Sequence, residues 1–374
     1  MAGIYVHIPF CKKACHYCDF HFATNTKGIP EMLQAIQLEA AMQRNYLTEK
    51  VNTIYFGGGT PSLVPEQELR TMIDTLNKIY TPLPDAEITL EANPDDITIE
   101  KAAAWKAMGI NRLSIGIQSF FEQDLRWMNR AHTATQAMNC IDMVQAAGFK
   151  NITIDLIYGT PGLTDEQWKE NINRALAFGV PHLSCYALTV EPKTALAKMI
   201  ADKTVASVDT DQQARHFVLL LELLGQAGFE QYEISNFAKP GFRSRHNSAY
   251  WQGSHYLGLG PSAHSFNGTS RQWNIRNNAL YINSISRGLI PYELETLTDT
   301  QQLNEYIMTS LRTIEGISME HIRLGWGEAL SEELLLAAKK HLDKGHIILN
   351  GNRIQLSNSG RFLADGIASD LFSV

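Results

Sequence analysis

Three cysteines near the start of the chain constrain its fold more than any other feature. Cys11, Cys15 and Cys18 have the spacing C-x3-C-x2-C. The apolar run of residues 4–10 leads directly into them and predicts a short buried strand, so the cysteines should lie on the loop at its C-terminal end. Three thiolates on one loop can hold a [4Fe-4S] cluster and leave one iron without a protein ligand. Such an open iron can bind a small molecule.

Other interpretations of the cysteines remain open at this point. They could be ordinary buried side chains, or they could form a zinc site with His16 or His21, since three thiolates and a histidine are an accepted zinc set. A disulfide framework is less favoured, because the total of five cysteines is odd and the remaining two, Cys140 and Cys185, are scattered.

Length and composition predict an enzyme-sized protein with one large domain and one or two small ones. The 374 residues are 44% apolar, which is ample for a core. The net charge of −7, without a basic run, does not favour binding to nucleic acid. No apolar run approaches the roughly 18 residues of a membrane span. The early cysteine loop leaves no room for a removable signal peptide, and free thiols predict a reducing cytoplasm.

Six apolar segments alternate with helical ones along the first half of the chain. Strands are predicted at residues 4–10, 51–56, 86–90, 112–117, 151–157 and 182–188, and a long helical stretch is predicted between residue 120 and Gly148. Strands that are joined through helices should be parallel, and continuous apolar strands should be buried on both faces. The pattern predicts an α/β fold with an incomplete (β/α)6 barrel, open on one side and suited to a large substrate.

Polar or special residues lie at the same end of five of these strands. They are the cysteines, the glycine run 57–59, Glu91, Gln118 and Asp155. In a β/α barrel the C-terminal strand ends form one rim, where sites are built. A glycine run brings bare backbone close to a ligand, because no Cβ intervenes. We therefore expect these residues to share one site.

The strand ends also carry five longer motifs. They are Tyr5-Val-His-Ile-Pro-Phe-Cys11, Gly57-Gly-Gly-Thr-Pro61, Leu90-Glu-Ala-Asn-Pro94, Ser114-Ile-Gly-Ile-Gln-Ser-Phe120 and Ile154-Asp-Leu-Ile-Tyr-Gly-Thr-Pro161. Together they resemble the coproporphyrinogen III oxidase group of radical S-adenosylmethionine (SAM) proteins, in which the open iron binds the amino and carboxylate groups of SAM. The resemblance implies that SAM is bound by Tyr5, Tyr17, Gly58, Gly59, Thr60, Glu91, Gln118, Arg130 and Asp155. Arg130 falls in the long predicted helical stretch, where an arginine is commonly a solvated charge.

One departure separates this chain from the oxidases of the group. They carry a further cysteine two residues after the third, where this chain has Phe20. The chain is therefore similar to the HemW branch, whose members are considered haem chaperones. His246-Asn-Ser-Ala-Tyr-Trp251 matches the HNxxYW motif that this branch associates with haem binding, which implies His246, Asn247, Tyr250 and Trp251 as haem-binding residues.

The haem ligand itself is not fixed by this motif. Imidazole is a common ligand of haem iron, and aromatic faces suit a flat macrocycle. His255 and His264 remain alternatives to His246 as the ligand. Several basic side chains of this region could meet the haem propionates, namely Lys239, Arg243, Arg245, Arg271 and Arg276.

The last quarter of the chain changes in character. Helical signals at 302–313, 318–324 and 331–343, strand signals at 346–350 and 353–356, and a helix at 358–369 resemble a winged helix. Residues 300–374 hold seven Lys and Arg against nine Asp and Glu, which does not suit phosphate contacts, so we interpret this region as a lid or protein-interaction module. The expected domains are a radical SAM core (1–235), a haem-binding connecting segment (236–299) and a small, mostly helical, winged-helix-like C-terminal domain (300–374).

The resemblance implies a haem chaperone that transfers haem to apo-haemoproteins and uses a [4Fe-4S] cluster with SAM as a structural or regulatory element. Membrane-associated respiratory enzymes are among the candidate acceptors, a homodimer is allowed, and no nucleic-acid partner is expected. The alternative is an oxygen-independent coproporphyrinogen III oxidase, which Phe20 disfavours, and a radical SAM enzyme with an unrelated substrate stays open. No residue is assigned as catalytic.

Overall fold

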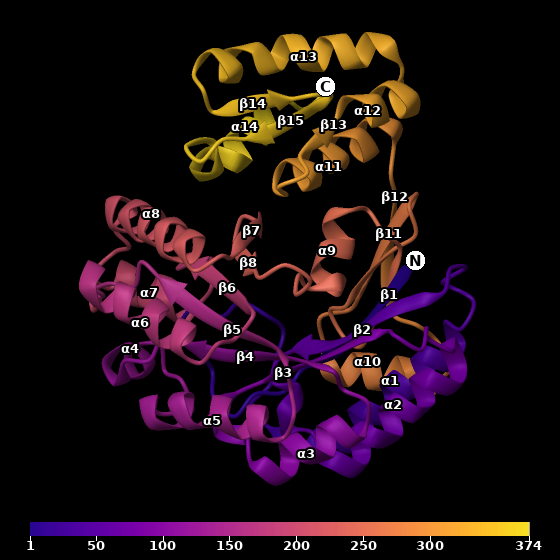
Figure 1. Ribbon diagram of the computed structural model, residues 1–374. Coiled ribbons are helices and arrows are strands. Elements are labelled where there is room, and N and C mark those ends of the chain that lie inside the picture. Colours follow the sequence, from indigo (N-terminus) through magenta and orange to yellow (C-terminus); the bar gives the residue numbers. More distant parts are fainter. Residues whose placement is uncertain (374) are drawn as a thin grey trace.

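Six parallel strands follow one another in the sheet in the order in which they occur in the chain. They are β1 (Ala2–Ile8), β2 (Val51–Gly58), β3 (Glu87–Ala92), β4 (Arg112–Gln118), β5 (Asn151–Tyr158) and β6 (His182–Ala187). Each pairs in parallel with the next. This computed structural model describes residues 1–373, and within them the predicted incomplete β/α barrel is confirmed (Figure 1).

Helices cover the outer face of these strands. They include α1 (Ile29–Met42), α2 (Glu66–Tyr80), α3 (Ile99–Ala107), α6 (Asp165–Ala177) and α8 (Thr210–Gln226). The short α7 (Ala195–Ala201) lies instead beside the cysteine loop, where the Leu196 amide donates to the His16 carbonyl at 2.7 Å. Short 3-10 turns lie at Thr26–Gly28, Pro61–Leu63 and Pro94–Asp96. One apolar core fills the space between strands and helices, with fully buried residues such as Ile4, Phe56, Trp105 and Trp168. This core holds the strand ends in fixed relative positions.

The long helical stretch predicted between residue 120 and Gly148 is wrong. The structure has two helices there, α4 (Glu122–Trp127) and α5 (Ala134–Ala146). Asn129 between them has φ = 58°, a left-handed conformation that ends the first helix. Thr133 and Gln136 then form a capping box that begins the second. Arg130 therefore lies in a turn rather than on a helix surface.

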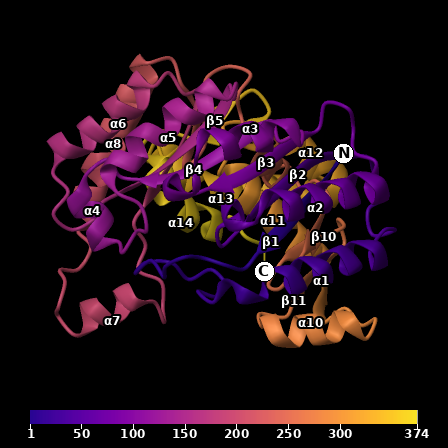
Figure 2. The same cartoon turned by 90° about the horizontal axis from the view of Figure 1, so that it is seen from below.

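Residues 230–296 extend the sheet at both of its ends. β7 (Glu230–Glu233) and β8 (Asn236–Ala238) add to β6, whereas β9 (Tyr256–Leu259), β10 (His264–Phe266), β11 (Ser270–Asn274) and β12 (Tyr292–Thr296) add to β1. The segment also holds α9 (Arg245–Trp251) and α10 (Asn278–Ser286), and Figure 2 shows α10 beside α1. Within the described residues β7 and β12 do not pair, so the barrel stays open.

The C-terminal domain has its own small sheet and core. It comprises α11 (Asp299–Leu311), β13 (Ile317–Ser318), α12 (Met319–Trp326), α13 (Glu328–Asp343), β14 (Ile347–Asn350), β15 (Arg353–Leu356), a 3-10 turn (Gly360–Leu363) and α14 (Ala364–Asp370). The strand order is β13-β15-β14. The predicted winged-helix-like arrangement is confirmed, and the last predicted helix is divided into the turn and α14.

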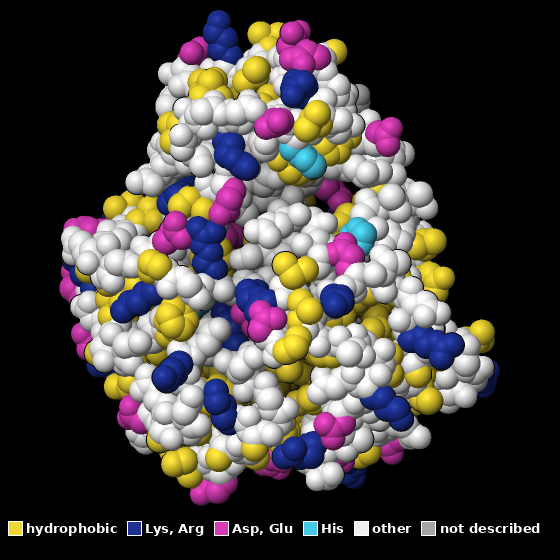
Figure 3. All heavy atoms as spheres, turned by 45° about the vertical axis from the view of Figure 1, so that its right-hand side comes forward, with side chains coloured by type: hydrophobic (Ala, Val, Ile, Leu, Met, Phe, Trp, Pro, Cys, Tyr) yellow, Lys and Arg dark blue, Asp and Glu magenta, His cyan; other side chains and the backbone are white. Residues whose placement is uncertain are grey.

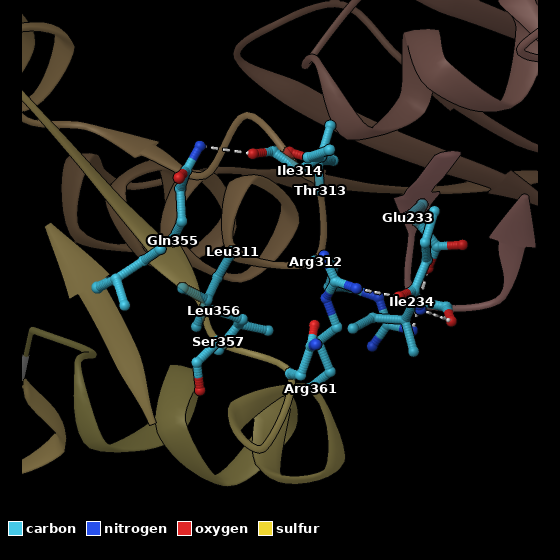
Figure 4. A pocket seen from close by; sticks show the side chains of 13 residues that line it. Glu233, Ile234, Leu311, Arg312, Thr313, Ile314, Gln355, Leu356, Ser357 and Arg361 are labelled. Carbon is cyan, nitrogen blue, oxygen red and sulfur yellow. Dashed lines mark hydrogen bonds and ion pairs between the residues drawn. The ribbon is translucent and has the colours of Figure 1, made fainter. Parts of the chain in front are cut away.

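The C-terminal domain lies across the open side of the barrel (Figure 1). Its Ile314 amide donates to the Tyr232 carbonyl at 3.0 Å, and Arg312 reaches the buried Glu233 at 3.4 Å. A cavity of about 340 Å³ lies at this junction, and Figure 4 shows Arg312 and Arg361 on its C-terminal side and Glu233 on the barrel side.

On the face in Figure 3, Lys and Arg side chains are scattered among Asp and Glu rather than gathered over one element. Among residues 1–373, no helix combines the length and the apolar character needed to cross a bilayer.

Candidate functional site

One open cavity of about 440 Å³ lies at the C-terminal ends of the parallel strands, and we call it the rim cavity. Most of the predicted site residues line it, namely Cys11, Cys15, Tyr17, Cys18, Gly58, Gly59, Thr60, Glu91, Gln118, Arg130, Asp155 and Asn247. They come from separate segments of the chain, and they meet because parallel strands place their carboxyl ends on one edge. Tyr5, His246, Tyr250 and Trp251 are outside the lining.

The three cysteines follow β1 on a half-buried loop. The Thr60 hydroxyl donates to Cys11 Sγ and the Arg130 guanidinium donates to Cys15 Sγ, each at 3.4 Å. Burial raises the pKa of Cys11 to about 11 and that of Cys18 to about 12. Without a metal these side chains are therefore neutral thiols at pH 7. A metal centre that takes thiolates would displace their protons.

The loop fits an iron–sulfur cluster better than it fits a zinc ion with a histidine ligand. His16 Nδ1 is hydrogen bonded to the Trp127 carbonyl at 2.8 Å, and His21 Nε2 is bonded to Asn278 Oδ1 at 2.6 Å. Neither histidine lines the rim cavity. Within residues 1–373, no three His, Cys, Asp or Glu side chains converge on one single-ion site. In a cubane each thiolate binds a different iron, so the three sulfurs need not meet at one point.

The glycine run at the end of β2 is packed too tightly for side chains. A Cβ on Gly58 would lie 2.6 Å from the His7 ring, and Gly58 has φ = 110°, which side-chain-bearing residues rarely adopt. A Cβ on Gly59 would lie 2.5 Å from the Phe10 carbonyl oxygen. The Thr60 amide donates to this same oxygen at 2.7 Å. The run thus binds the start of the cysteine loop and leaves bare backbone facing the cavity.

Glu91 is held between this glycine run and an inward-facing tyrosine. Its two carboxylate oxygens accept hydrogen bonds from the Tyr55 hydroxyl at 2.7 Å and from the Gly58 amide at 3.2 Å. Burial, together with the nearby charge of Asp155, raises the pKa of Glu91 to about 7. The carboxylate is thereby fixed in position and available to a cationic or hydroxyl-bearing ligand.

The next two strands contribute a strained residue and a second carboxylate. Gln118 has φ = 65° at the end of β4, where the pairing with β5 is irregular. This left-handed conformation is uncommon outside glycine and costs strain energy, which makes the position a candidate for function. Asp155 accepts a hydrogen bond from the Ser114 hydroxyl at 3.2 Å, and burial raises its pKa to about 6.

Arg130 is half-buried in the lining of the rim cavity, in contrast to the solvated position that a helix surface would give it. Its guanidinium donates to Asn93 Oδ1 at 2.7 Å and to the Gly116 carbonyl at 2.8 Å, besides Cys15 Sγ. It also lies 3.4 Å from the Tyr17 hydroxyl. The turn between α4 and α5 therefore places one positive charge among the cysteines and the ends of β3 and β4.

His246 of the HNxxYW motif is enclosed by protein. It is 2% exposed, its Nδ1 is hydrogen bonded to Thr53 Oγ1 at 2.8 Å, and its Nε2 is bonded to the Tyr250 hydroxyl at 3.0 Å. Its ring is stacked on Tyr55 with 4.9 Å between centroids. Burial lowers the pKa of His246 to about 3. In this structure neither ring nitrogen is free for an iron.

The other residues of the motif lie on different sides of α9. Asn247 lines the rim cavity, whereas Tyr250 packs edge-on against Tyr256 at 4.5 Å. Trp251 lies under the Arg312 guanidinium at 5.3 Å and so contacts the C-terminal domain. Tyr5 lies behind the cavity wall, with its ring 6.1 Å from that of Tyr55. The motif thus joins β1, β2 and the C-terminal domain.

Several lining residues were not predicted from the sequence. They include Phe22, Tyr55, Asn93, Ser114, Ser184, Tyr186 and Glu191. Tyr55, Ser114, Ser184 and Tyr186 alternate with apolar residues that face the helices, and this alternation within β2, β4 and β6 was the available signal. Phe20 also lines the cavity and is 67% exposed at its mouth.

Comparisons with known proteins agree with this geometry. Residues 5–175 match the Radical SAM superfamily, and residues 297–363 match the HemN C-terminal domain. The chain is 33% identical to "Heme chaperone HemW" of Bacillus subtilis, over 98% of each chain. It is 35% identical to the protein of the same name from Mycobacterium tuberculosis, over 99% of this chain and 94% of that one.

A solved structure shares the whole fold. Coproporphyrinogen III oxidase (HemN) from Escherichia coli superposes with a TM-score of 0.86 at 22% identity, covering 100% of this chain and 90% of that one. At this identity the likeness concerns the fold alone. The near full-length relatives and the two matched families decide the assignment. The chain belongs to the HemW family of radical SAM proteins.

Proposed function

We propose that this protein is a haem chaperone, which binds haem and passes it to apo-haemoproteins while carrying a [4Fe-4S] cluster and SAM at the rim cavity. The observation that carries the proposal is the similarity to proteins named heme chaperones along nearly the whole chain. A cavity whose lining includes three thiols, a glycine run and the carboxylates of Glu91 and Asp155 supports the cluster and SAM part of the proposal.

Cys11, Cys15 and Cys18 would hold the cluster. When bound, the cluster supplies an iron with an open coordination position and a source of one electron. The chain's own contribution is electrostatic, because Arg130 and the Thr60 hydroxyl direct donors at two of the sulfurs. Such donors stabilise thiolates relative to thiols and so favour loading of the site.

SAM would occupy the part of the rim cavity beyond the cysteines. Its amino group is positive, and so is its sulfonium, which suits a cavity with Glu91 and Asp155. The bare backbone of Gly58, Gly59 and Thr60 offers close polar contacts, and Gln118 and Arg130 would face the adenosyl and ribose part. Tyr17 lies in the lining beside the cysteines, whereas Tyr5 would act from behind Tyr55.

The HNxxYW helix, α9, packs against residues at the wall of the rim cavity. His246 stacks on Tyr55, and Tyr55 donates to Glu91, so the motif histidine reaches the SAM side through one intervening ring. Asn247, the next residue, lines the cavity directly. We infer that α9 fixes the shape of the SAM site.

Phe20 favours a chaperone over an oxidase. Its phenyl ring stands at the mouth of the rim cavity, at the position where the oxidases that the sequence resembles carry a further cysteine. A phenyl group cannot ligate iron or exchange a proton, so any chemistry of that cysteine is unavailable here.

The cellular setting follows from the thiols. All five cysteines are free, which suits a reducing cytoplasm. The acceptors would be apo-haemoproteins, and membrane-associated respiratory enzymes are the class to test first.

A transfer assay tests the proposal. The anaerobically purified protein is loaded with haemin and mixed with apo-myoglobin as a probe acceptor, and haem movement is followed by absorbance. In parallel, the protein is incubated with SAM, a reductant and coproporphyrinogen III, and protoporphyrinogen IX is assayed. We expect transfer without turnover. Turnover of coproporphyrinogen without transfer would make the oxidase the better answer.

A further inference from the structure

A haem carrier needs an iron ligand that an incoming macrocycle can reach. An imidazole can serve only through a ring nitrogen that is not already bonded. The chain has twelve histidines. Among residues 1–373, two of them, His264 and His321, are exposed and make no side-chain hydrogen bond. His255, the third candidate from the sequence, is half-buried and lies 3.6 Å from Glu49.

His264 lies on the face of the sheet that turns away from α1. Gln272 and Asn274 of β11 bond to Gln43 and Glu39 of α1 at 3.1 Å and 2.7 Å, so they mark the helix side. Side chains alternate along a strand, so Trp273 faces the other way, and its cross-strand partner His264 shares that face. We call this face of β10 and β11 the His264 face. It is turned towards α9 and the C-terminal domain, because Phe266 of this face lies 6.1 Å from Tyr256, which packs on Tyr250 of α9, and Arg271 pairs with Glu305.

The aromatic neighbour of His264 is suitably placed for a planar ligand. The His264 and Trp273 rings have centroids 6.0 Å apart and planes inclined by 28°. A macrocycle whose iron binds the imidazole would lie against an exposed sheet face with an indole beside it. Aromatic surface of this kind stabilises flat rings by burial and by ring–ring contact.

A free cation lies near the same face. Arg276 is exposed, its guanidinium donates to the Asp19 carbonyl, and no carboxylate pairs with it among residues 1–373. Arg271, by contrast, is already paired with Glu305 at 2.8 Å. Arg276 follows Trp273 by three residues, just beyond the end of β11, so its backbone lies near the cross-strand pair of Trp273 and His264. A guanidinium so placed can take a propionate carboxylate.

The cysteine loop separates this face from the rim cavity. Phe20 and Phe22 line the cavity, whereas the backbone of the same segment faces the other way. The His21 carbonyl is bonded to His7 Nε2 at 2.8 Å, and the Asp19 carbonyl is bonded to Arg276. A ligand on the His264 face would therefore be beside the cluster loop and outside the SAM site.

We propose that His264 is the haem-iron ligand and that Arg276 contacts a haem propionate. Haem then lies on the His264 face next to the cluster loop, and His246 keeps its position under Tyr55. The proposal rests on the proposed function, since it requires that the chain carry haem. It adds the location and the ligand of that haem.

The test uses haemin titration of the full-length, cluster-containing protein, followed at the Soret band in the ferric and the reduced form. His264→Ala is compared with His321→Ala, a matched control. His321 is also exposed and flanked by aromatic rings, at 4.4 Å from Tyr306, but it belongs to α12 of the C-terminal domain. We expect His264→Ala to lose the histidine-ligated spectrum and to bind haem about tenfold or more weakly, at least the loss caused by removing an outer-shell partner of a metal ligand. Added imidazole should restore the spectrum.

The possible outcomes separate this inference from the proposed function. If the wild type binds haem and His264→Ala keeps both its spectrum and its affinity, the ligand assignment is overturned while the chaperone function stands. If the wild type itself binds no haem, the proposed function fails. Loss of the spectrum in His321→Ala with retention in His264→Ala would place haem on the C-terminal domain and contradict the assignment.

Discussion

The rim cavity and the HNxxYW helix both consist of motif residues, but they expose them in opposite ways. At the rim, three thiols and four carboxylates, among them Glu91 and Asp155, face an open cavity. In α9, the motif histidine faces inward and has both ring nitrogens occupied. The difference has a physical origin, because the strand ends project side chains into an open cavity, whereas His246 of α9 packs on Thr53 and Tyr55 of β2. A sequence motif can therefore mark either a ligand-binding site or a buried packing contact between elements.

The largest expected effect is the loss of iron and sulfide when one of the three loop cysteines is replaced. The reconstituted wild type should hold about four irons and four sulfides per chain. Cys11→Ala, Cys15→Ala or Cys18→Ala should each abolish this content, because each removes one thiolate of the only group of cysteines lining the rim cavity. Iron and sulfide analysis after anaerobic reconstitution measures it.

The two buried cysteines provide the matched controls. Cys140→Ala and Cys185→Ala should keep the iron and sulfide content, since both side chains lie in the core away from the loop. Stoichiometric zinc without sulfide in the wild type would contradict the cluster assignment.

Removing the motif histidine should mainly affect folding. His246→Ala deletes two buried hydrogen bonds and leaves a cavity beside Tyr55, so the free energy of unfolding should fall by about 2–4 kcal/mol. Urea denaturation measures this loss, and His321→Ala should stay within about 0.5 kcal/mol of the wild type. If the His246→Ala variant kept full stability and lost only its haem spectrum, His246 rather than His264 would be the haem ligand.

The barrel could be predicted from the sequence because its strands are long and apolar, whereas the short strands that extend its sheet could not. β1 to β6 are continuous buried runs, and their shared polar ends indicated the site. β8 to β12 have only three to five residues each, and the two that attach to the barrel, β8 and β9, pair with β6 and β1 far away in the chain, which no local pattern shows. The burial of His246 depends on Thr53, 193 residues earlier, so its role could not be deduced from the motif.

Arg130 shows the same limit inside the site. Local periodicity continued a helix through it, because nothing nearby in the sequence indicated that Asn129 would adopt a left-handed conformation. Its partners Asn93 and Cys15 come from other segments of the chain. Only the resemblance to radical SAM proteins pointed to this residue.

Loss of a rim carboxylate should weaken SAM binding without removing the cluster. Glu91→Ala and Asp155→Ala should each cost about 1.5–3 kcal/mol of SAM affinity, the range for hydrogen bonds to charged groups. The perturbation of the cluster spectrum by SAM measures binding, and iron content serves as the internal reference. Glu100→Ala, an exposed carboxylate on α3, should bind SAM as the wild type does. Normal binding by both rim variants would refute the shared-rim arrangement.

The same carboxylate predicts a pH dependence. Because the pKa of Glu91 is raised to about 7, the side chain gains a proton and loses its charge as the pH falls through 7. SAM affinity should decrease by up to about tenfold for each pH unit below that value. Glu91→Gln should flatten the profile measured from pH 8 to pH 6. A profile of unchanged slope in this variant would assign the titration to another group.

The smallest effect concerns the free cation on the His264 face. Arg276→Ala should weaken haem binding by about 0.5–1 kcal/mol, as expected for an exposed ion pair, and leave the Soret position unchanged. Haemin titration at low and high salt measures it, since an exposed pair is screened by salt. Arg287→Ala, exposed at the end of α10, is the matched control. If the two variants weakened haem binding equally, Arg276 would not contact the haem.

The central claim is that the cluster with SAM and the haem occupy two separate sites on one chain. The most direct measurement titrates haemin and SAM into two variants, the Cys11→Ala/Cys15→Ala/Cys18→Ala triple substitution and His264→Ala. We predict that the triple variant binds haem with the wild-type Soret spectrum and has no cluster, whereas His264→Ala keeps the cluster and its response to SAM but loses the histidine-ligated haem spectrum. Loss of histidine-ligated haem in the triple variant, or of the cluster in His264→Ala, would contradict the account.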